Sequence, residues 1–352
     1  MPENNMVIRT GLLAYGMSGQ VFHAPFLNCM PEFDFTGVVE RHQKKARDLY
    51  PDVRSYDSVE ALLADRDITL VVVNTPNTTH YDYVKKALEA GKHVVVEKPF
   101  TATVGQAESL VEIAAAAGRF LCVYQNRRWD SDFLTVKDVM DKGLLGKLIE
   151  AELHYDRYRI AINDKKKHKE VPDTGVGLLY DLGPHLVDEA IVLFGKPRAV
   201  FAIVQSHRPD SLVDDYFDIK LLYNKFTCTL KSSLLVREQL PGYVMHGTLG
   251  SFVKARADIQ EAELQAGVSP CSPGWGEEPE ASWGILHTER EGRVIREPYP
   301  SVVGDYREFF RGVHAALVSN EPPPVPLADS LLNMRILEAA QQSSREMRAV
   351  EL

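Results

Sequence analysis

Cysteine is scarce in this chain of 352 residues, which contains only Cys29, Cys122, Cys228 and Cys271. The four are widely separated and form no C-x-x-C pair, the spacing typical of zinc sites and redox-active thiols. Neither a metal site nor a disulfide framework is therefore expected. Scattered thiols are typical of a reducing compartment, and the cytoplasm is the simplest location.

Long apolar runs and an excess of basic charge are also missing. No stretch approaches the roughly 20 apolar residues of a membrane helix, and the first ten residues contain no apolar signal region. The net charge of −9 argues against a nucleic-acid partner, because a phosphate backbone attracts a basic surface. A composition of 45% hydrophobic and 25% charged residues indicates a globular chain, long enough for two domains.

Strand-like and helical segments alternate over the first 125 residues. Alternation of this kind predicts βαβ units and a parallel sheet, here a dinucleotide-binding Rossmann domain over residues 1–125. The predicted strands are 7–14, 35–39, 69–74, 93–97 and 120–124, and the predicted helices are 18–30, 80–91 and 104–118.

The pattern changes beyond residue 125. Strand-like runs follow one another directly from 198 to 256, which favours an antiparallel sheet in an α+β domain over 126–352. The other elements predicted there are a long strand at 148–159 and helices near 132–142, 177–194, 304–318 and 328–347. The last helix is expected to pack back near the first domain.

The segment "AYGMSG" (14–19) resembles the G-x-G-x-x-G fingerprint with its first glycine missing. The second glycine of that fingerprint lets the backbone approach a pyrophosphate, and the third lets the helix pack on the strand. Gly16 and Gly19 occupy these two positions. Ala14 is tolerated at the first if its φ is negative. We expect the backbone of Gly16, Met17 and Ser18 to face the pyrophosphate of NAD(H) or NADP(H). The alternative is an ordinary strand–helix corner.

Two residues at the end of the second predicted strand bear on the choice of dinucleotide. Glu40 could accept hydrogen bonds from the ribose hydroxyls, which favours NAD. Arg41 could pair with the 2′-phosphate of NADP. The sequence leaves both open.

Four stretches carry a family resemblance: "VVVEKPF" (94–100), "NTPNTTH" (74–80), "YQNRRWDSDF" (124–133) and "LLYDLGPHLVD" (178–188). Together they resemble the Gfo/Idh/MocA oxidoreductases, and the last two resemble the NAD(P)-dependent scyllo-inositol dehydrogenase branch. The resemblance implies a Rossmann domain followed by an α+β domain with a large, open, mostly antiparallel sheet. It also implies a homo-oligomer, a dimer or tetramer, formed through that sheet.

The sequence departs from the family at two places. Ala14 replaces the first glycine, and a lysine-rich segment that includes Lys165–Lys169 replaces a Trp-Arg-Glu segment. The second departure leaves the substrate open.

Alcohol oxidation needs a general base for the hydroxyl proton and a cation for the developing alkoxide. Asp181 precedes His185 by four residues, so on one helix they share a face, and the carboxylate can orient the imidazole. An ordinary surface ion pair is the alternative. Gly183 and Pro184 lie between them, so the helix either starts or is distorted there.

Lys98 follows a strand at its carboxyl end, where open α/β sheets bind ligands. Its predicted role is to stabilise the alkoxide, and the alternative is an exposed lysine at a strand end. The resemblance further implies a cis bond between Lys98 and Pro99.

The remaining predicted contacts follow from their places after the strands and from the resemblance. The predicted cofactor contacts are Thr75, Pro76, Asn77, His80 and Glu97, and the predicted substrate contacts are Asn126, Arg127, Tyr158 and Tyr180.

These residues predict an NAD(P)-dependent dehydrogenase that acts on a polyol, inositol or sugar. Two alternatives are an NAD-dependent glycosidase that uses transient oxidation and a non-catalytic dinucleotide-sensing regulator.

Overall fold

The computed structural model describes residues 6–162 and 171–352, so the predicted role of Lys165–Lys169 lies outside the described residues. The chain divides into two compact units. Two later segments of the chain belong to the first unit. The first unit comprises 1–126, 259–275 and 305–331, and the second comprises 127–258, 276–304 and 332–352.

A six-stranded parallel sheet forms the centre of the first unit, in the order β3-β2-β1-β4-β5-β6. One of the two central strands, β4, consists of four buried residues, as expected for a strand covered by helices on both faces. The strands are β1 (Ile8–Leu12), β2 (Phe33–Val39), β3 (Arg54–Tyr56), β4 (Leu70–Val73), β5 (His93–Glu97) and β6 (Leu121–Tyr124).

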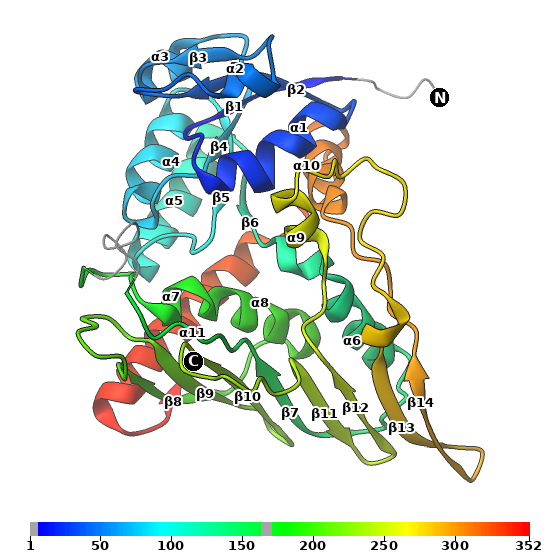
Figure 1. Cartoon of the computed structure of the whole chain (residues 1–352). Coiled ribbons are helices and arrows are strands. Elements are labelled where there is room, and N and C mark those ends of the chain that lie inside the picture. The colour runs from blue at the N-terminus through cyan, green and yellow to red at the C-terminus, as the bar shows by residue number, and fades with distance from the viewer. Residues whose placement is uncertain (1–5, 163–170) are drawn as a thin grey trace. The chain divides into compact units, whose positions relative to one another are not determined.

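Helices cover both faces of this sheet (Figure 1). Strand order runs one way from β1 to β3 and the other way from β4 to β6, so right-handed crossovers place α1 opposite α4 and α5. The helices are α1 (Ala24–Cys29), α2 (Ala46–Leu49), α3 (Val59–Ala64), α4 (His80–Glu89), α5 (Val104–Ala117), α9 (Gln260–Gln265) and α10 (Arg307–Ser319), with a 3₁₀ turn η2 at Asn77–Thr79.

The predicted helix at 18–30 has an irregular start. Residues Gly19–His23 form a π-helical turn, η1, and α1 follows it. Stacking of Phe26 on Phe310, with ring centroids 4.9 Å apart, packs α1 against α10. A late segment of the chain thus completes the core of the first unit.

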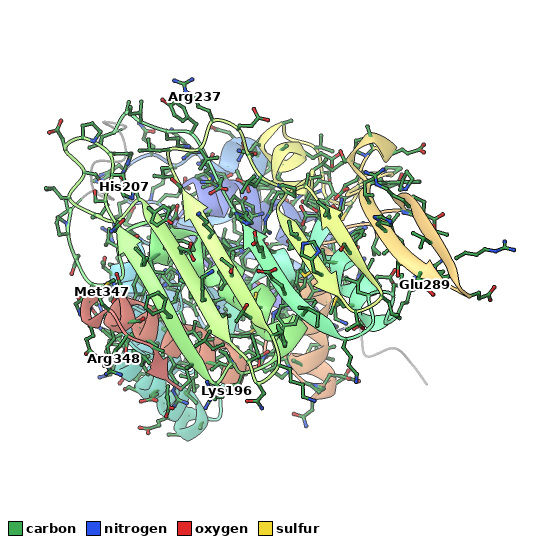
Figure 2. The ribbon with its side chains drawn as sticks, turned by 90° about the horizontal axis from the view of Figure 1, so that it is seen from below. Lys196, His207, Arg237, Glu289, Met347 and Arg348 are labelled. Carbon is green, nitrogen blue, oxygen red and sulfur yellow. A yellow bond between two sulfur atoms is a disulfide. The ribbon has the colours of Figure 1, made fainter. Side chains whose placement is uncertain are left out.

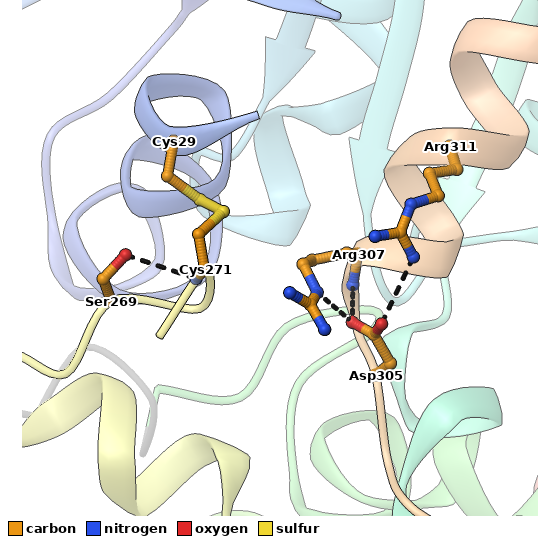
Figure 3. The surroundings of a disulfide bond; sticks show 6 residues. All are labelled: Cys29, Ser269, Cys271, Asp305, Arg307 and Arg311. Carbon is orange, nitrogen blue, oxygen red and sulfur yellow. Dashed lines mark hydrogen bonds and ion pairs between the residues drawn. A yellow bond between two sulfur atoms is a disulfide. The ribbon is translucent and has the colours of Figure 1, made fainter. Parts of the chain in front are cut away.

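A disulfide joins Cys29, at the end of α1, to Cys271 (Figure 3). The prediction that the cysteines form no disulfide was wrong. The two residues are 242 positions apart in the sequence, and only the return of segment 259–275 to the first unit brings them together. Trp275 in that segment is buried and packs edge-on to Phe26.

The second unit contains a nine-stranded sheet in the order β14-β13-β12-β11-β7-β10-β9-β8-β15. Among the described residues, only β7 and β10 of this sheet pair in parallel, which confirms the predicted large, mostly antiparallel sheet. Its strands are β7 (Leu148–His154), β8 (Ala199–Gln205), β9 (Tyr216–Leu222), β10 (Thr227–Ser233), β11 (Tyr243–Gly247), β12 (Gly250–Lys254), β13 (Gly284–Arg290), β14 (Arg293–Tyr299) and β15 (Val350–Glu351).

Helices of the second unit pack on one face of this sheet, and the opposite face is seen without a covering helix in Figure 2. The predicted strand at 148–159 ends earlier, at His154. The helical elements are α6 (Ser131–Asp141), α7 (Leu178–Asp181), α8 (Gly183–Phe194) and α11 (Leu327–Glu346), with 3₁₀ turns η3 (Asn126–Trp129) and η5 (Glu280–Ser282). Helix α11 begins in the first unit.

No helix among residues 6–162 and 171–352 is both long and apolar enough to cross a membrane. The same residues contain no group of three His, Cys, Asp or Glu side chains placed to hold a metal ion.

Candidate active site

The first turn of the first unit is held by Asn74, just after β4. Its Oδ1 accepts a hydrogen bond of 3.0 Å from the Ala14 N–H, and its Nδ2 donates one of 2.8 Å to the Ala14 carbonyl. Ala14 is not among the described non-glycine residues with positive φ, which confirms the predicted negative φ. Alanine therefore replaces the first glycine without backbone strain.

The two glycines of the turn have different surroundings. A Cβ on Gly19 would lie 2.5 Å from the Ala14 carbonyl oxygen, so only glycine lets the helix start this close to the strand. A Cβ on Gly16 would meet nothing within 4 Å. Met17 beside it is exposed, and Ser18 is partly exposed. The backbone at Gly16 is thus open, as a pyrophosphate cradle requires.

Glu97, at the end of β5, binds the first turn. The Ser18 hydroxyl donates to its carboxylate, and Nε2 of His23 lies 2.8 Å from the same oxygen. Burial alone would raise the pKa of Glu97, but His23, Ser18 and the charge of Lys98 outweigh it and hold that pKa below its ordinary value. The π turn ends at His23, which is fully buried.

Lys98 follows Glu97 and is partly exposed, and the Lys98–Pro99 bond is cis, as the resemblance implied. The buried His80 supports this turn through hydrogen bonds. Its ring nitrogens lie 2.9 Å from the carbonyl oxygens of Pro99 and Thr75, and complete burial lowers its pKa. His80 thus contacts protein on both sides of its ring.

A cavity of about 670 Å³ opens at the carboxyl ends of β1, β2 and β4. Glu40 is at its edge but only 6% exposed. Its Oε1 accepts hydrogen bonds from the backbone N–H groups of Lys45, at 2.7 Å, and Ala46, at 3.1 Å. Its Oε2 accepts one of 2.8 Å from the Ser55 hydroxyl. The predicted ribose ligand therefore already holds the turn that leads into α2.

Other predicted cofactor contacts surround the same cavity. Arg41 is exposed and donates to the Tyr83 hydroxyl at 3.1 Å. Thr75 and Pro76 line the cavity. Asn77 begins the turn η2, and its Oδ1 accepts the Thr78 N–H at 3.0 Å.

Asp181 and His185 lie at a junction between two helices of the second unit. Asp181 ends α7, and α8 begins at Gly183 with Pro184 in its first turn. The continuous helix predicted near 177–194 is thus interrupted, as one of the two readings of Gly183 and Pro184 expected. His185 is only 5% exposed, and Asp181 is half-buried.

The predicted substrate residues have unlike surroundings. Asn126 is buried at the start of η3. Arg127 pairs with Asp130 at 3.0 Å, and its guanidinium lies 5.1 Å from the centre of the Tyr155 ring.

The two predicted tyrosines differ in exposure. Tyr158 is 37% exposed, and the Arg237 guanidinium lies 4.0 Å from its ring centre. Tyr180 is only 1% exposed, and burial raises its pKa. Tyr180 is thus part of the core of the second unit.

Two family profiles match the chain. An oxidoreductase family with an NAD-binding Rossmann fold matches residues 8–125, and the C-terminal alpha/beta domain of the same family matches residues 137–352. The chain belongs to the Gfo/Idh/MocA family of oxidoreductases.

Relatives of this Gfo/Idh/MocA oxidoreductase match it over almost their whole length. An oxidoreductase of Schizosaccharomyces pombe is 40% identical over 98% of this chain and 99% of its own. The scyllo-inositol 2-dehydrogenase (NADP(+)) IolW of Bacillus subtilis is 37% identical over 98% of this chain and 96% of its own. A crystal structure from Bacteroides fragilis, 48% identical, superposes with a TM-score of 0.90 over 98% of this chain and all of its own.

The first unit of this Gfo/Idh/MocA protein fits a nicotinamide dinucleotide. Gly16 leaves the backbone open where a pyrophosphate binds, and the adjoining cavity has room for an adenosine. When bound, the nicotinamide ring supplies the hydride acceptor or donor of the reaction.

Sequence reasoning missed four residues that hold this Gfo/Idh/MocA site together: Asn74, His23, Ser55 and Tyr83. Asn74 is the last residue of the predicted strand at 69–74 and directly follows β4, a position that could have indicated it. The other three act through contacts between segments far apart in sequence, for which one sequence carries no signal.

Proposed function

We propose that this oxidoreductase transfers a hydride between NAD(P) and a secondary alcohol of a polyol, inositol or sugar. The observation that carries the proposal is the link from Ser18 to Glu97. It ties the dinucleotide turn to the strand end that bears Lys98, so a substrate hydroxyl at Lys98 lies next to the cofactor turn. The similarity to a scyllo-inositol dehydrogenase over nearly the whole chain supports the substrate class.

Three side chains have the proposed chemical roles. The Lys98 ammonium donates to the substrate oxygen and stabilises it as an alkoxide. His185 accepts the hydroxyl proton during oxidation and returns it during reduction. Asp181 orients the imidazole. Arg127 and Asn126 are proposed to contact substrate hydroxyls or the cofactor amide, and Tyr158 is a weaker candidate. The burial of Tyr180 gives no support to a direct contact.

The test is nicotinamide absorbance with the purified full chain and a panel of inositols, pentoses and hexoses, with each dinucleotide. We expect turnover with at least one inositol or sugar. His185→Gln should lower kcat by about 10²–10⁴-fold, the usual contribution of a general base, with unchanged dinucleotide affinity. No turnover with any member of the panel would count against the proposal.

The same experiment separates the two alternatives. A glycosidase that uses transient oxidation would release sugar from a glycoside with no net change in nicotinamide absorbance. A dinucleotide-sensing regulator would bind the cofactor and show neither reaction.

We also propose that copies of the chain associate through the helix-free face of the nine-stranded sheet. The exposed apolar side chain of Val294 on β14, which points away from the face of the buried Leu286 and Thr288, supports this. Light scattering with Val294→Asp tests it, and a monomeric wild type would contradict it. A cytoplasmic location, where reduced dinucleotide is supplied, completes the proposal even though the Cys29–Cys271 disulfide is of a kind that is rare in reducing compartments, and cell fractionation tests it.

A further inference from the structure

The occupied carboxylate of Glu40 bears on the choice between the two dinucleotides. In NAD-selective Rossmann sites the acid after the second strand accepts the 2′-hydroxyl of the adenosine ribose. Here both oxygens of Glu40 already accept hydrogen bonds, two from backbone N–H groups and one from Ser55. These three donors also offset the negative charge that would otherwise repel a phosphate.

Two cations at the same cavity form no ion pair within the described residues. Arg41 and Lys45 both line it, and in the described part of the chain no carboxylate forms an ion pair with either. Lys44 differs, because its ammonium lies 2.6 Å from Asp57 and 2.6 Å from the Glu40 carbonyl oxygen. Glu60 interacts with Arg41 only through space, so the cavity presents positive charge that is not held in an ion pair.

Arg41 is also oriented. Its Nη2 donates to the hydroxyl of Tyr83 on α4, a neutral partner that fixes the side chain without cancelling its charge. A guanidinium offers several donors in one plane and binds a phosphate through two of them at once.

We infer that this cavity selects NADP(H) over NAD(H), with Arg41 and Lys45 binding the 2′-phosphate and Glu40 serving as a structural clamp of the turn before α2. The inference rests on the proposed dinucleotide binding and adds to it the phosphate that is recognised. Glu40 is thus a positioning residue: it holds the segment 41–45 in place and leaves the phosphate to the cations.

The test is isothermal titration calorimetry of the full chain with NADPH and NADH, and with 2′,5′-ADP and 5′-AMP, which probe the adenosine end alone. We expect NADPH and 2′,5′-ADP to bind at least tenfold more tightly than their partners lacking the phosphate. Arg41→Gln should weaken NADPH binding by about 10–100-fold, the loss of a charge-assisted pair, and leave NADH within about twofold. Lys45→Gln should have a smaller effect in the same direction.

Arg66→Gln is the matched control, because Arg66 is an exposed cation of the same unit that does not line the cavity. It should leave both affinities unchanged. Raising the salt concentration should weaken NADPH binding more than NADH binding, because the extra contact is ionic.

Three outcomes would overturn the inference. Equal or tighter binding of NADH by the wild type removes the selectivity. Equal weakening of NADPH and NADH by Arg41→Gln assigns Arg41 to the adenine ring. Failure of both dinucleotides to bind removes the proposed function as well, and is thereby distinguished from the first two.

Discussion

Two strand ends of the first unit each carry a glutamate, Glu40 buried and Glu97 largely buried, and the two are held in different ways. Glu40 after β2 accepts from two backbone N–H groups and a serine hydroxyl, donors that do not titrate near neutral pH. Glu97 at the end of β5 accepts from Ser18 and contacts the imidazole of His23. The region after β2 is thus fixed for binding, whereas the region after β5 contains ionisable groups beside Lys98. An acid at a strand end is a weaker indication of a ligand contact when the protein itself supplies donors to both of its oxygens.

The largest expected effect is a loss of catalytic rate without a loss of cofactor affinity. Lys98→Met should lower kcat by about 10²–10³-fold, because it removes the cation that stabilises the alkoxide. NADPH affinity by calorimetry should remain within about twofold. Arg41→Gln is the converse control, with lower NADPH affinity and nearly unchanged kcat at saturating cofactor. If Lys98→Met kept full turnover, the region after β5 would have no catalytic role.

The next effect concerns the support of Glu97. His23→Phe should destabilise the protein at neutral pH by roughly 2 kcal/mol, because a buried carboxylate loses a hydrogen-bond partner. His23→Gln, whose amide can still donate, should recover most of the loss. Thermal unfolding and NADPH affinity are to be measured for both variants. Equal unfolding temperatures and affinities of the two would mean that His23 acts through packing alone.

The pH dependence of this effect has a definite sign. The pKa of Glu97 is lowered by folding from its ordinary 4.5, so its contribution to stability is present above that value and is lost as pH falls through the folded pKa. His23→Phe should therefore narrow the gap in unfolding temperature between neutral pH and pH values below 4.5. An unchanged gap would mean that His23 does not set the ionisation of Glu97.

Ser55→Ala should have a smaller effect, because Glu40 keeps its two backbone donors. We expect a loss of about 1 kcal/mol in the free energy of unfolding, measured by urea denaturation, and little change in NADPH affinity. A gain in NADH affinity after this change would show that the released oxygen of Glu40 binds the ribose. It would contradict a purely structural role for Glu40.

Ala14→Gly should have the smallest effect. The φ of Ala14 is already compatible with alanine, and the Asn74 amide binds only the backbone of residue 14. We expect dinucleotide affinity within about twofold and a loss of up to about 1 kcal/mol from the added freedom of the unfolded chain. A tenfold tightening of the cofactor would mean that Ala14 limits the turn.

The sequence was sufficient to predict what depends on local periodicity. Buried runs such as Leu70–Val73 gave the strands, and the carboxyl ends of parallel strands gave the places of Gly16 and Lys98. The π turn at Gly19–His23 was not predicted, because its residues are compatible with an ordinary helix start. The orientation of Glu40 was not predicted either, since it depends on Ser55, 15 residues further along the chain.

The second unit was predicted less completely, for a related reason. Alternating runs indicated the antiparallel strands, but the hairpin of β13 and β14 was missed because most residues of β14 are exposed and its polar and apolar residues do not alternate. The role of the segment 259–275 in the first unit follows from a return of the chain that no local pattern records.

The bond between Cys29 and Cys271 makes the chain a covalent ring with two tails. A protease that cut once anywhere between these residues would open the backbone without releasing a fragment. The two pieces would migrate apart in a denaturing gel only after treatment with a reductant. The intervening loop spans 242 positions, and in the chain-entropy picture closing a loop of that size disfavours the unfolded state by about 5 kcal/mol. Most of the nine-stranded sheet lies within this ring, so its strands remain tethered to the first unit even after such a cut.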